Sequence, residues 1–275
     1  MVSATPGAMA HKYVDVELRP GGYAVLTITK EPVNSLNLDA WRELDAALAE
    51  LEENSAVSGL IIVSGLKRDV FCAGNDILEL YPPKTTAQRY AEVWTTSNRF
   101  LARLHASRLA TVAAVRGACP AGGCIIAMCC DHRVMSAPGS IGLNEVQLGI
   151  PVPKYWAMVM TKLIGAKAAD KLLLTGRLAT AQEAKTLGLV DELVPKEQLM
   201  ASAEGVMLKL VMLPAGAVAA TKKSLRADFA QEWEAFSRTE PEGAWTFLNR
   251  PDTIRTLEGA LQRLSGSKPK PAAKL

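Results

Sequence analysis

Alternating apolar and polar residues open the chain and predict a β-hairpin. The alternation runs over 13–18 and 23–29, and the residues between them, 19–22 (RPGG), are typical of a turn. Residues 59–64 (GLIIVS) are instead almost entirely apolar, which is the pattern of a strand buried on both faces of a sheet. Further short apolar segments predict strands at 111–115, 131–137 and 189–194.

Apolar residues at helical spacing separate these strands. Asp39 is placed to cap a helix whose apolar positions run from Trp41 to Leu51. Residues 85–105 also have helical spacing, and a histidine at the end, His105, is more typical of a helix terminus than of a catalyst. Further helices are predicted at 124–130, 155–163, 167–174, 181–187, 197–213, 215–229, 232–248 and 252–264.

Composition narrows the class of protein. The 275 residues are 49% hydrophobic, which is enough for a sizeable core in one large domain. The formal net charge of +3 is too weak to favour nucleic-acid or membrane binding. No apolar run reaches the roughly 18 residues of a transmembrane helix, and 1–12 has no apolar signal core.

Two glycine-containing turns and one carboxylate carry the candidate chemistry. The turn 117–124 (GACPAGGC) lies between a predicted strand and a helix that begins near Gly122. The first N–H groups of a helix lack intrahelical partners, and glycine lets a ligand oxygen approach them, so this turn suits a partial negative charge. A second turn, 71–76 (FCAGND), follows the buried strand. Taken separately, both turns also fit plain strand-to-helix connections, and Glu145 also fits a surface carboxylate.

Cysteines crowd the first of these turns. Their spacing differs from the paired C-x2-C spacing of zinc sites, so we interpret them as small, buried, reduced residues of an intracellular protein. They are Cys119, Cys124, Cys129 and Cys130.

Three segments in order carry a resemblance to a known family. FCAGND (71–76), GACPAGGC (117–124) and GLNEVQLG (142–149) together resemble the enoyl-CoA hydratase/isomerase (crotonase) superfamily. The last two are most similar to the mitochondrial-type Δ3,Δ2-enoyl-CoA isomerases, or dodecenoyl-CoA isomerases. The resemblance implies an α/β fold, a spiral of stacked β-β-α turns followed by a C-terminal helical region that forms homotrimers, sometimes paired into hexamers.

The resemblance also implies a reaction. Two backbone N–H groups, on Ala73 and Gly122, would hold the thioester oxygen of an acyl-CoA. Hydratases of the superfamily carry two glutamates, whereas this chain keeps only Glu145 and has Ile125 at the other position. One carboxylate can move a proton from C2 of an enoyl-CoA to C4. The expected activity is therefore isomerisation of 3-cis- or 3-trans-enoyl-CoA to 2-trans-enoyl-CoA in β-oxidation of unsaturated fatty acids.

Further substrate contacts follow from the same resemblance. Lys222 and Lys223 are candidates for the CoA phosphates, with solvated surface lysines as the alternative. No metal and no separate cofactor is expected, because CoA is part of the substrate. The expected substrate-binding residues are Ala73, Gly74, Asn75, Asp76, Ile77, Gly122 and Asn144.

The expected organisation has four parts: a flexible N-terminus (1–12), the spiral core (13–200), a helical trimerisation region (201–265) and a disordered tail (266–275). The tail ends in Ala273-Lys274-Leu275, a variant of the Ser-Lys-Leu address that the peroxisomal import receptor reads. It predicts a peroxisome or glycosome-like organelle, with the mitochondrial matrix as the alternative.

Two other functions stay open. The chain could be a hydratase or another crotonase-type acyl-CoA enzyme that uses Glu145 alone, but Ile125 argues against hydration. It could also be a non-catalytic relative that binds acyl-CoA or RNA. The retained Glu145 and the weak net charge argue against that second class.

Overall fold

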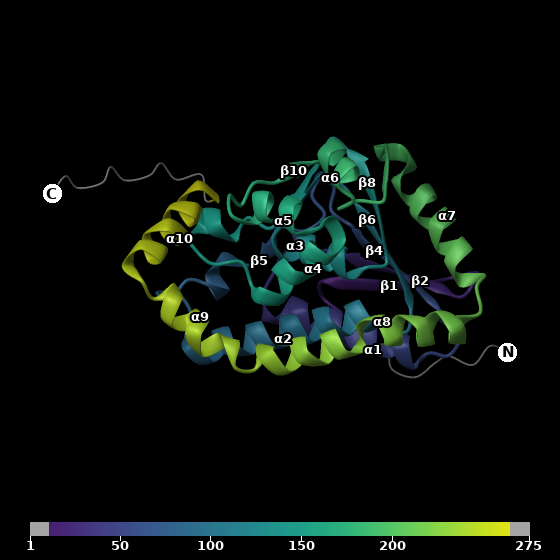
Figure 1. Ribbon diagram of the computed structural model, residues 1–275, viewed down its shortest axis with the longest axis horizontal. Helices are drawn as coiled ribbons and strands as arrows, with labels where there is room; N and C mark the ends of the chain where they lie inside the picture. The colour runs from purple at the N-terminus through teal and green to yellow at the C-terminus, as the bar shows by residue number, and fades with distance from the viewer. Residues whose placement is uncertain (1–10, 265–275) are drawn as a thin grey trace.

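The structure, a computed structural model, describes residues 11–264 and is built on a six-stranded sheet. The strand order is β1-β2-β4-β6-β8-β11, with β1 antiparallel to β2 and the other neighbours parallel (Figure 1). All the strands predicted from the sequence are present. The sheet comprises β1 Val14–Arg19, β2 Tyr23–Ile28, β4 Gly59–Ser64, β6 Ala110–Val115, β8 His132–Ala137 and β11 Glu192–Pro195.

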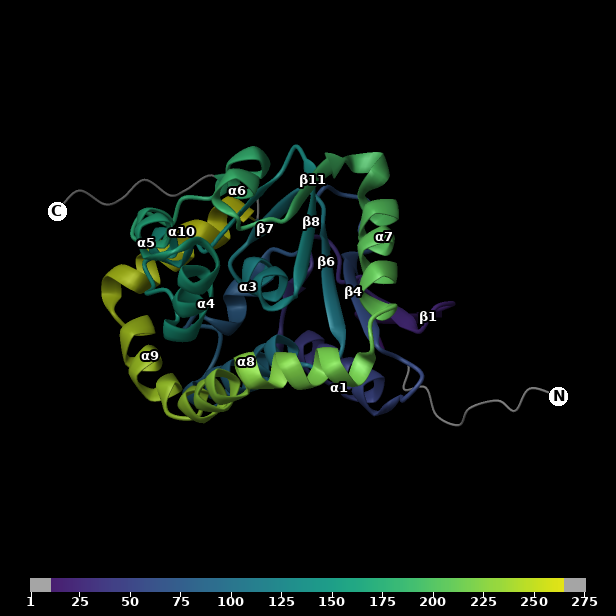
Figure 2. The same ribbon diagram turned by 45° about the vertical axis from the view of Figure 1, so that its right-hand side comes forward.

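Alternation along the central strands explains why they are apolar throughout. Leu60 and Ile62 of β4 pack into the main core, whereas Ile61 between them packs into a second cluster with α7 (Leu199–Val211). Successive side chains of a strand point to opposite faces, so both faces of this sheet are covered. Figure 2 shows α7 alongside β4, β6 and β8. The expected boundary at 200/201 therefore falls inside a helix that belongs to the core.

Helices cover the opposite face and extend past it. In Figure 1, α8 and α9 run along the lower edge of the molecule, and α10 lies at the end opposite α7. Besides α7, the helices are α1 Leu38–Glu53, α2 Ala87–Ala106, α3 Gly122–Cys129, α4 Lys154–Ile164, α5 Ala166–Leu173, α6 Ala181–Leu187, α8 Ala215–Ser237, α9 Glu240–Leu248 and α10 Pro251–Leu264, with short 3-10 turns at Ile77–Glu79, Glu145–Leu148 and Lys196–Gln198.

Two helix boundaries differ from the prediction. The side chain of Asn37, and not that of Asp39, caps α1 by accepting from the Ala40 N–H. The helix predicted to end at 229 continues to Ser237, because no glycine or proline interrupts the intervening residues. The break comes at Arg238 and Thr239, and Pro241 follows in the first turn of α9, where proline is tolerated.

Two small sheets of very short strands lie beside the main sheet. Strands β7 (Ala118–Pro120), β9 (Ser140–Gly142) and β10 (Ala179–Thr180) form one of them. Strands β3 (Ser35–Leu36) and β5 (Gly74–Asn75) form the other. These pairings fix the loops that carry the candidate chemistry.

The predicted targeting tripeptide and nearly all of the predicted flexible N-terminus lie outside the described residues. Within 11–264, no single helix has the length and hydropathy needed to cross a membrane. The pair Lys196–Val211 and Ala215–Ser237, bent by 97° at its break, meets the criterion jointly, by length and composition alone.

Candidate active site

The two glycine-containing turns meet with their backbones in contact. A Cβ added to Gly74 would lie 2.7 Å from the nitrogen of Gly122, and one added to Gly122 would lie 3.0 Å from the Gly74 Cα. A Cβ on Gly123 would lie only 2.3 Å from the carbonyl oxygen of Cys72. No side chain fits between the turns, so these glycines are required by the close approach.

The start of α3 is held by the small sheet. Ala121 precedes the helix at a φ of 48°, and its N–H donates to the Gly142 oxygen at 2.9 Å. This contact turns the chain so that Gly122 is the first residue of the helix. Its N–H has no intrahelical acceptor and no partner in the described part of the chain. The anion-binding position predicted at Gly122 is therefore geometrically available.

The second predicted donor is engaged elsewhere. The Ala73 N–H donates to the Val33 oxygen at 3.0 Å, and the Asp76 N–H donates to the Leu36 oxygen at 3.0 Å. The positive φ of Gly74 interrupts the alternation after Ala73. Asn75 directly precedes Asp76 in the strand register, so its N–H points to the side opposite the Asp76 N–H, away from β3. Its nitrogen lies 3.2 Å from the Cβ position of Gly122. The geometry thus favours the N–H groups of Asn75 and Gly122 as the donor pair, in place of Ala73 and Gly122.

Glu145 is a buried carboxylate without a partner. It opens a 3-10 turn directly after β9 and is 4% exposed. Neither carboxylate oxygen has a hydrogen-bond partner among the described residues, and the same holds for Oδ1 of its neighbour Asn144. Burial raises the pKa of Glu145 to about 7. Such a group can accept and return a proton near neutral pH.

A single cavity of about 680 Å³ joins these elements. Both Asn144 and Glu145 line it, as does Asn75. Its far wall is aromatic and aliphatic and comes from four helices, α2, α4, α9 and α10. Residues of this wall include Tyr90, Trp94, Trp156, Phe247, Leu248 and Leu261.

Most of the predicted site residues are brought together. Ala73, Asp76 and Ile77 also line the cavity, while Gly74 and Gly122 lie next to lining residues and contribute backbone only. Ile125 is fully buried in the main core. A further carboxylate that the sequence did not reveal, Glu240, lines the cavity besides Glu145 and Asp76 and accepts a hydrogen bond from the Trp94 indole at 2.8 Å.

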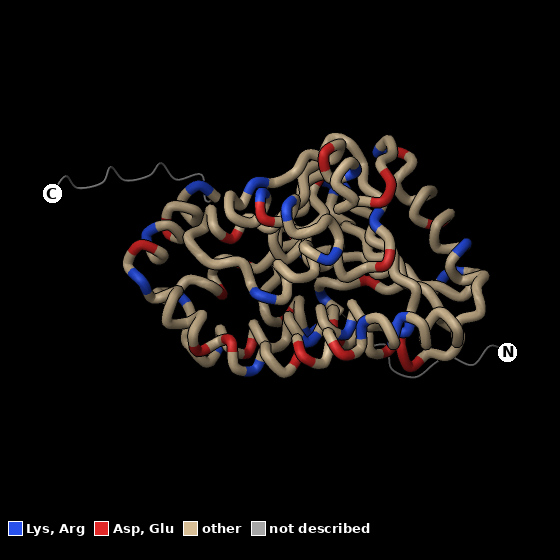
Figure 3. The backbone as a smooth tube through the Cα atoms, in the orientation of Figure 1, with Lys and Arg blue, Asp and Glu red and all other residues tan. Residues whose placement is uncertain are grey.

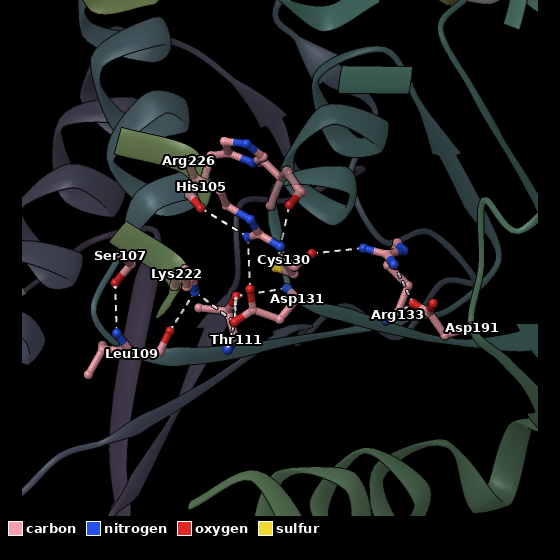
Figure 4. A network of polar contacts seen from close by, with 11 residues as sticks. His105, Ser107, Leu109, Thr111, Cys130, Asp131, Arg133, Asp191, Lys222 and Arg226 are labelled. Carbon is pink, nitrogen blue, oxygen red and sulfur yellow. Dashed lines mark hydrogen bonds and ion pairs between the residues drawn. The ribbon is translucent and has the colours of Figure 1, made fainter. Parts of the chain in front are cut away.

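The lysine candidates for the CoA phosphates are not at the cavity. Lys222 is buried and donates to the Leu109 oxygen at 2.7 Å and to Asp131 at 2.6 Å (Figure 4). Lys223 is exposed and does not line the cavity. The assignment of Lys222 was therefore wrong, because its ammonium group is used to join α8 to the core. Two exposed arginines, Arg68 and Arg263, line the cavity instead.

The same network accounts for His105. It lies at the end of α2, as predicted, and Arg226 bridges its carbonyl oxygen to Asp131 (Figure 4). Burial, aided by the positive charges of Arg226 and Lys222, lowers the pKa of His105 to about 3. His105 does not line the cavity, so its surroundings are structural.

The cysteines are buried, as predicted, and charged residues of both signs are spread over the outer helices (Figure 3). All five cysteines are free and buried, and within residues 11–264 no group of three or more His, Cys, Asp or Glu side chains could hold a metal ion. Figure 3 shows acidic and basic residues interspersed along the outer helices.

An apolar cavity with a buried carboxylate and two backbone donors is characteristic of enzymes that stabilise an enolate. The sequence matches the enoyl-CoA hydratase/isomerase family over residues 19–250, and the chain belongs to that family. It is 34% identical over 262 residues to "Enoyl-CoA delta isomerase 1, mitochondrial" of Mus musculus, covering 94% of this chain and 90% of the relative. It is 33% identical over 208 residues to the short-chain-enoyl-CoA hydratase of Clostridium acetobutylicum, covering 75% and 78%.

Solved structures show the same fold. Human mitochondrial delta3-delta2-enoyl-CoA isomerase matches with a TM-score of 0.89 at 33% identity, over 94% of this chain and 100% of that one. The enoyl-CoA hydratase of Bacillus halodurans matches with a TM-score of 0.82 at 25% identity, over 90% and 100%. The predicted family and α/β crotonase fold are confirmed, and the chain is a crotonase-type enoyl-CoA isomerase or hydratase.

Proposed function

We propose that this enzyme converts 3-cis- or 3-trans-enoyl-CoA to 2-trans-enoyl-CoA. One observation carries the proposal: Glu145 is buried in the cavity without a partner, and its pKa is raised by burial to about 7. A carboxylate of this basicity can remove a proton from the carbon next to a thioester and give it back. The mouse and human relatives, which are named as isomerases, support the choice.

The proposed reaction is a proton shuttle that balances within the substrate. Glu145 takes a proton from C2, the C2–H electrons form a C1–C2 double bond, and the thioester carbonyl electrons move onto the oxygen to give a dienolate. The N–H groups of Asn75 and Gly122 stabilise that oxygen more strongly than the thioester ground state. Glu145 then delivers the proton to C4, where the C3–C4 π electrons form the new C–H bond, the C1–C2 double bond shifts to C2–C3, and the thioester carbonyl forms again. The shuttle uses no metal or separate cofactor.

Hydration would require a second polar group near the reacting carbons. A water must be deprotonated while the other carbon is protonated, and the superfamily's hydratases use a second glutamate for this. Here that position is Ile125, which is packed in the core. Glu240 accepts a hydrogen bond from Trp94, which argues for a structural role.

The cavity also suggests how the substrate would lie. Indole and phenol rings of Tyr90, Trp94 and Trp156 stack at centroid distances of 5.8 and 5.9 Å and would contact the acyl chain. Arg68 and Arg263, being exposed at the cavity, are the candidates for the CoA phosphates. This pair replaces the two lysines suggested by the sequence.

The test is incubation with 3-trans-hexenoyl-CoA and analysis for 2-trans-hexenoyl-CoA. We expect conversion by the wild type and none by Glu145→Gln, with CoA-ester binding retained in the variant. Hydration of 2-trans-hexenoyl-CoA faster than isomerisation would favour the hydratase function, for which the Clostridium acetobutylicum relative is named. Binding without either reaction would favour a non-catalytic acyl-CoA-binding protein.

Assembly and location belong to the proposal as well. We propose a homotrimer, or a hexamer of two trimers, and light scattering should give a mass that is three or six times the chain mass of 29.5 kDa. A monomer in solution would contradict this. We also propose that Ala273-Lys274-Leu275 directs peroxisomal import, although the mouse and human relatives are named as mitochondrial. Deleting the three residues from a fluorescent fusion should release it to the cytosol, whereas unchanged or mitochondrial localisation would contradict the proposal.

A further inference from the structure

Asn34 does not line the cavity, but its side chain and backbone make specific hydrogen bonds. It is fully buried and has a left-handed backbone with φ of 53°, which is uncommon for any residue but glycine. Its side-chain Nδ2 donates to the Ser64 Oγ at 3.0 Å and to the Phe71 oxygen at 2.9 Å. A carboxylate or an apolar side chain could make neither of these bonds.

The backbone around Asn34 binds the next two residues of the turn. The Cys72 thiol donates to the Asn34 oxygen at 3.0 Å, and the Ala73 N–H donates to the Val33 oxygen at 3.0 Å. Consecutive residues 71–73 are thus fixed from one side by residues 33–34. The Gly74 N–H, in turn, donates to the Cys72 sulfur at 3.3 Å.

The segment 71–73, held by Val33 and Asn34, lies just before the proposed oxyanion donor of Asn75. Gly74 takes a positive φ of 86° directly after this segment, and Asn75 follows with its nitrogen 3.2 Å from the Cβ position of Gly122. Because the Ala73 N–H is used by Val33, the turn is held with the Asn75 N–H available. A small rotation of residues 71–73 would misalign that N–H, and donors stabilise an oxyanion only when they are aimed at it.

We propose that Asn34 is a positioning residue for the oxyanion donor of Asn75. It acts through the Phe71–Gly74 backbone, and the inference rests on the proposed function of that donor pair. A left-handed residue with a donor side chain is needed at this position. The left-handed backbone turns the Val33 and Asn34 carbonyl oxygens toward the Ala73 N–H and the Cys72 thiol. The side-chain amide of Asn34 holds the carbonyl oxygen of Phe71.

The test uses Asn34→Gly, which keeps the left-handed backbone accessible and removes only the amide. We expect kcat for 3-trans-hexenoyl-CoA to fall about 100-fold, the scale of losing one oxyanion donor. KM should change by less than about threefold, since the loss is in the transition state. The matched control is Asn37→Gly, which removes the α1 cap with little effect on stability. The control should keep wild-type kcat.

A second readout separates positioning from a general loss of structure. Hydrogen-bond donors lower the stretching frequency of a carbonyl, so the isotope-labelled thioester of bound hexanoyl-CoA reports on the donor pair by infrared spectroscopy. Asn34→Gly should lose this shift while still binding the ester. Retention of the shift in Asn34→Gly would overturn the inference, whether or not kcat falls.

If Asn34→Gly does not fold, the same criteria apply to Asn34→Asp, which tolerates the left-handed backbone and lacks the Nδ2 donor to Ser64 and Phe71. If the wild type does not isomerise 3-enoyl-CoA, the proposed function fails. The infrared shift on a bound saturated ester still decides whether Asn34 positions the donor.

Discussion

At the scale of single residues, the site combines features that each oppose folding. A carboxyl group is buried without a partner at Glu145, and Ala121 and Asn34 have backbones with positive φ. Each feature costs stability unless its surroundings enforce it. Their concentration around one cavity is the expected signature of a catalytic site, where proton affinity and donor geometry matter more than stability.

The pKa of Glu145 predicts the pH dependence of the reaction. A base must be ionised to accept the C2 proton, and burial raises the pKa of Glu145 to about 7. We therefore expect kcat/KM to rise tenfold per pH unit below about 7 and to level off above it. The measurement is the rate of 2-trans-hexenoyl-CoA formation between pH 5 and 9. A rate that is level down to pH 5 would mean that Glu145 is not the base.

The close contact at Gly123 predicts how much stability and activity are lost when a side chain separates the two turns. A Cβ there would meet the Cys72 oxygen at 2.3 Å, so Gly123→Ala should lose about 1–3 kcal/mol of unfolding free energy and most of the activity. Gly205 of α7 is the control, because an added Cβ meets nothing within 4 Å. Gly205→Ala should gain about 0.5–1 kcal/mol and keep full activity. Urea unfolding with parallel rate assays measures both, and equal stability of the two variants would contradict the packing argument.

At the scale of elements, the periodicity of apolar residues predicted the long strands and helices and missed the two-residue strands. The main-sheet strands and most helices have enough residues to display a period of 2 or 3.6. Strands β3 and β5 have two residues each and show no period, yet they decide which N–H faces Gly122. The family resemblance placed the oxyanion donor on Ala73, and no periodicity at β3 and β5 could correct it, while the pairing favours Asn75. The tertiary contacts that bury Glu145 and Lys222 were equally invisible in the sequence.

The contact between α8 and the core predicts the effect of removing Lys222. Its ammonium bonds Asp131 at 2.6 Å, and burial lowers the pKa of Lys222 although Asp131 opposes the shift. Lys222→Met should lose roughly 1–3 kcal/mol of stability, because the partly buried Asp131 and the Leu109 oxygen each keep one partner fewer. KM for the CoA ester should not change. The exposed neighbour is the control: Lys223→Met should alter neither quantity, and a raised KM in either variant would restore the phosphate-binding role.

At the scale of the whole molecule, two buried groups give stability opposite dependences on pH. Burial raises the pKa of Glu145 from 4.5 to about 7, so its favourable contribution is complete below pH 4.5 and is lost as the pH rises through 7. Burial lowers the pKa of His105 from 6.5 to about 3, so its contribution is complete above pH 6.5 and is lost as the pH falls toward 3. The two trends overlap between pH 4.5 and 6.5 and partly cancel.

Substitution should separate the two trends. Glu145→Gln removes the term that falls with pH, so relative to the wild type this variant should gain up to roughly 3 kcal/mol of unfolding free energy between pH 5 and pH 8. His105→Phe removes the contribution that is lost as the pH falls, so this variant should lose less stability than the wild type between pH 6.5 and pH 4. Urea unfolding of the three proteins at these pH values measures both effects. Parallel curves for wild type and Glu145→Gln would show that the carboxyl is hydrated in the free enzyme and that burial does not set its pKa.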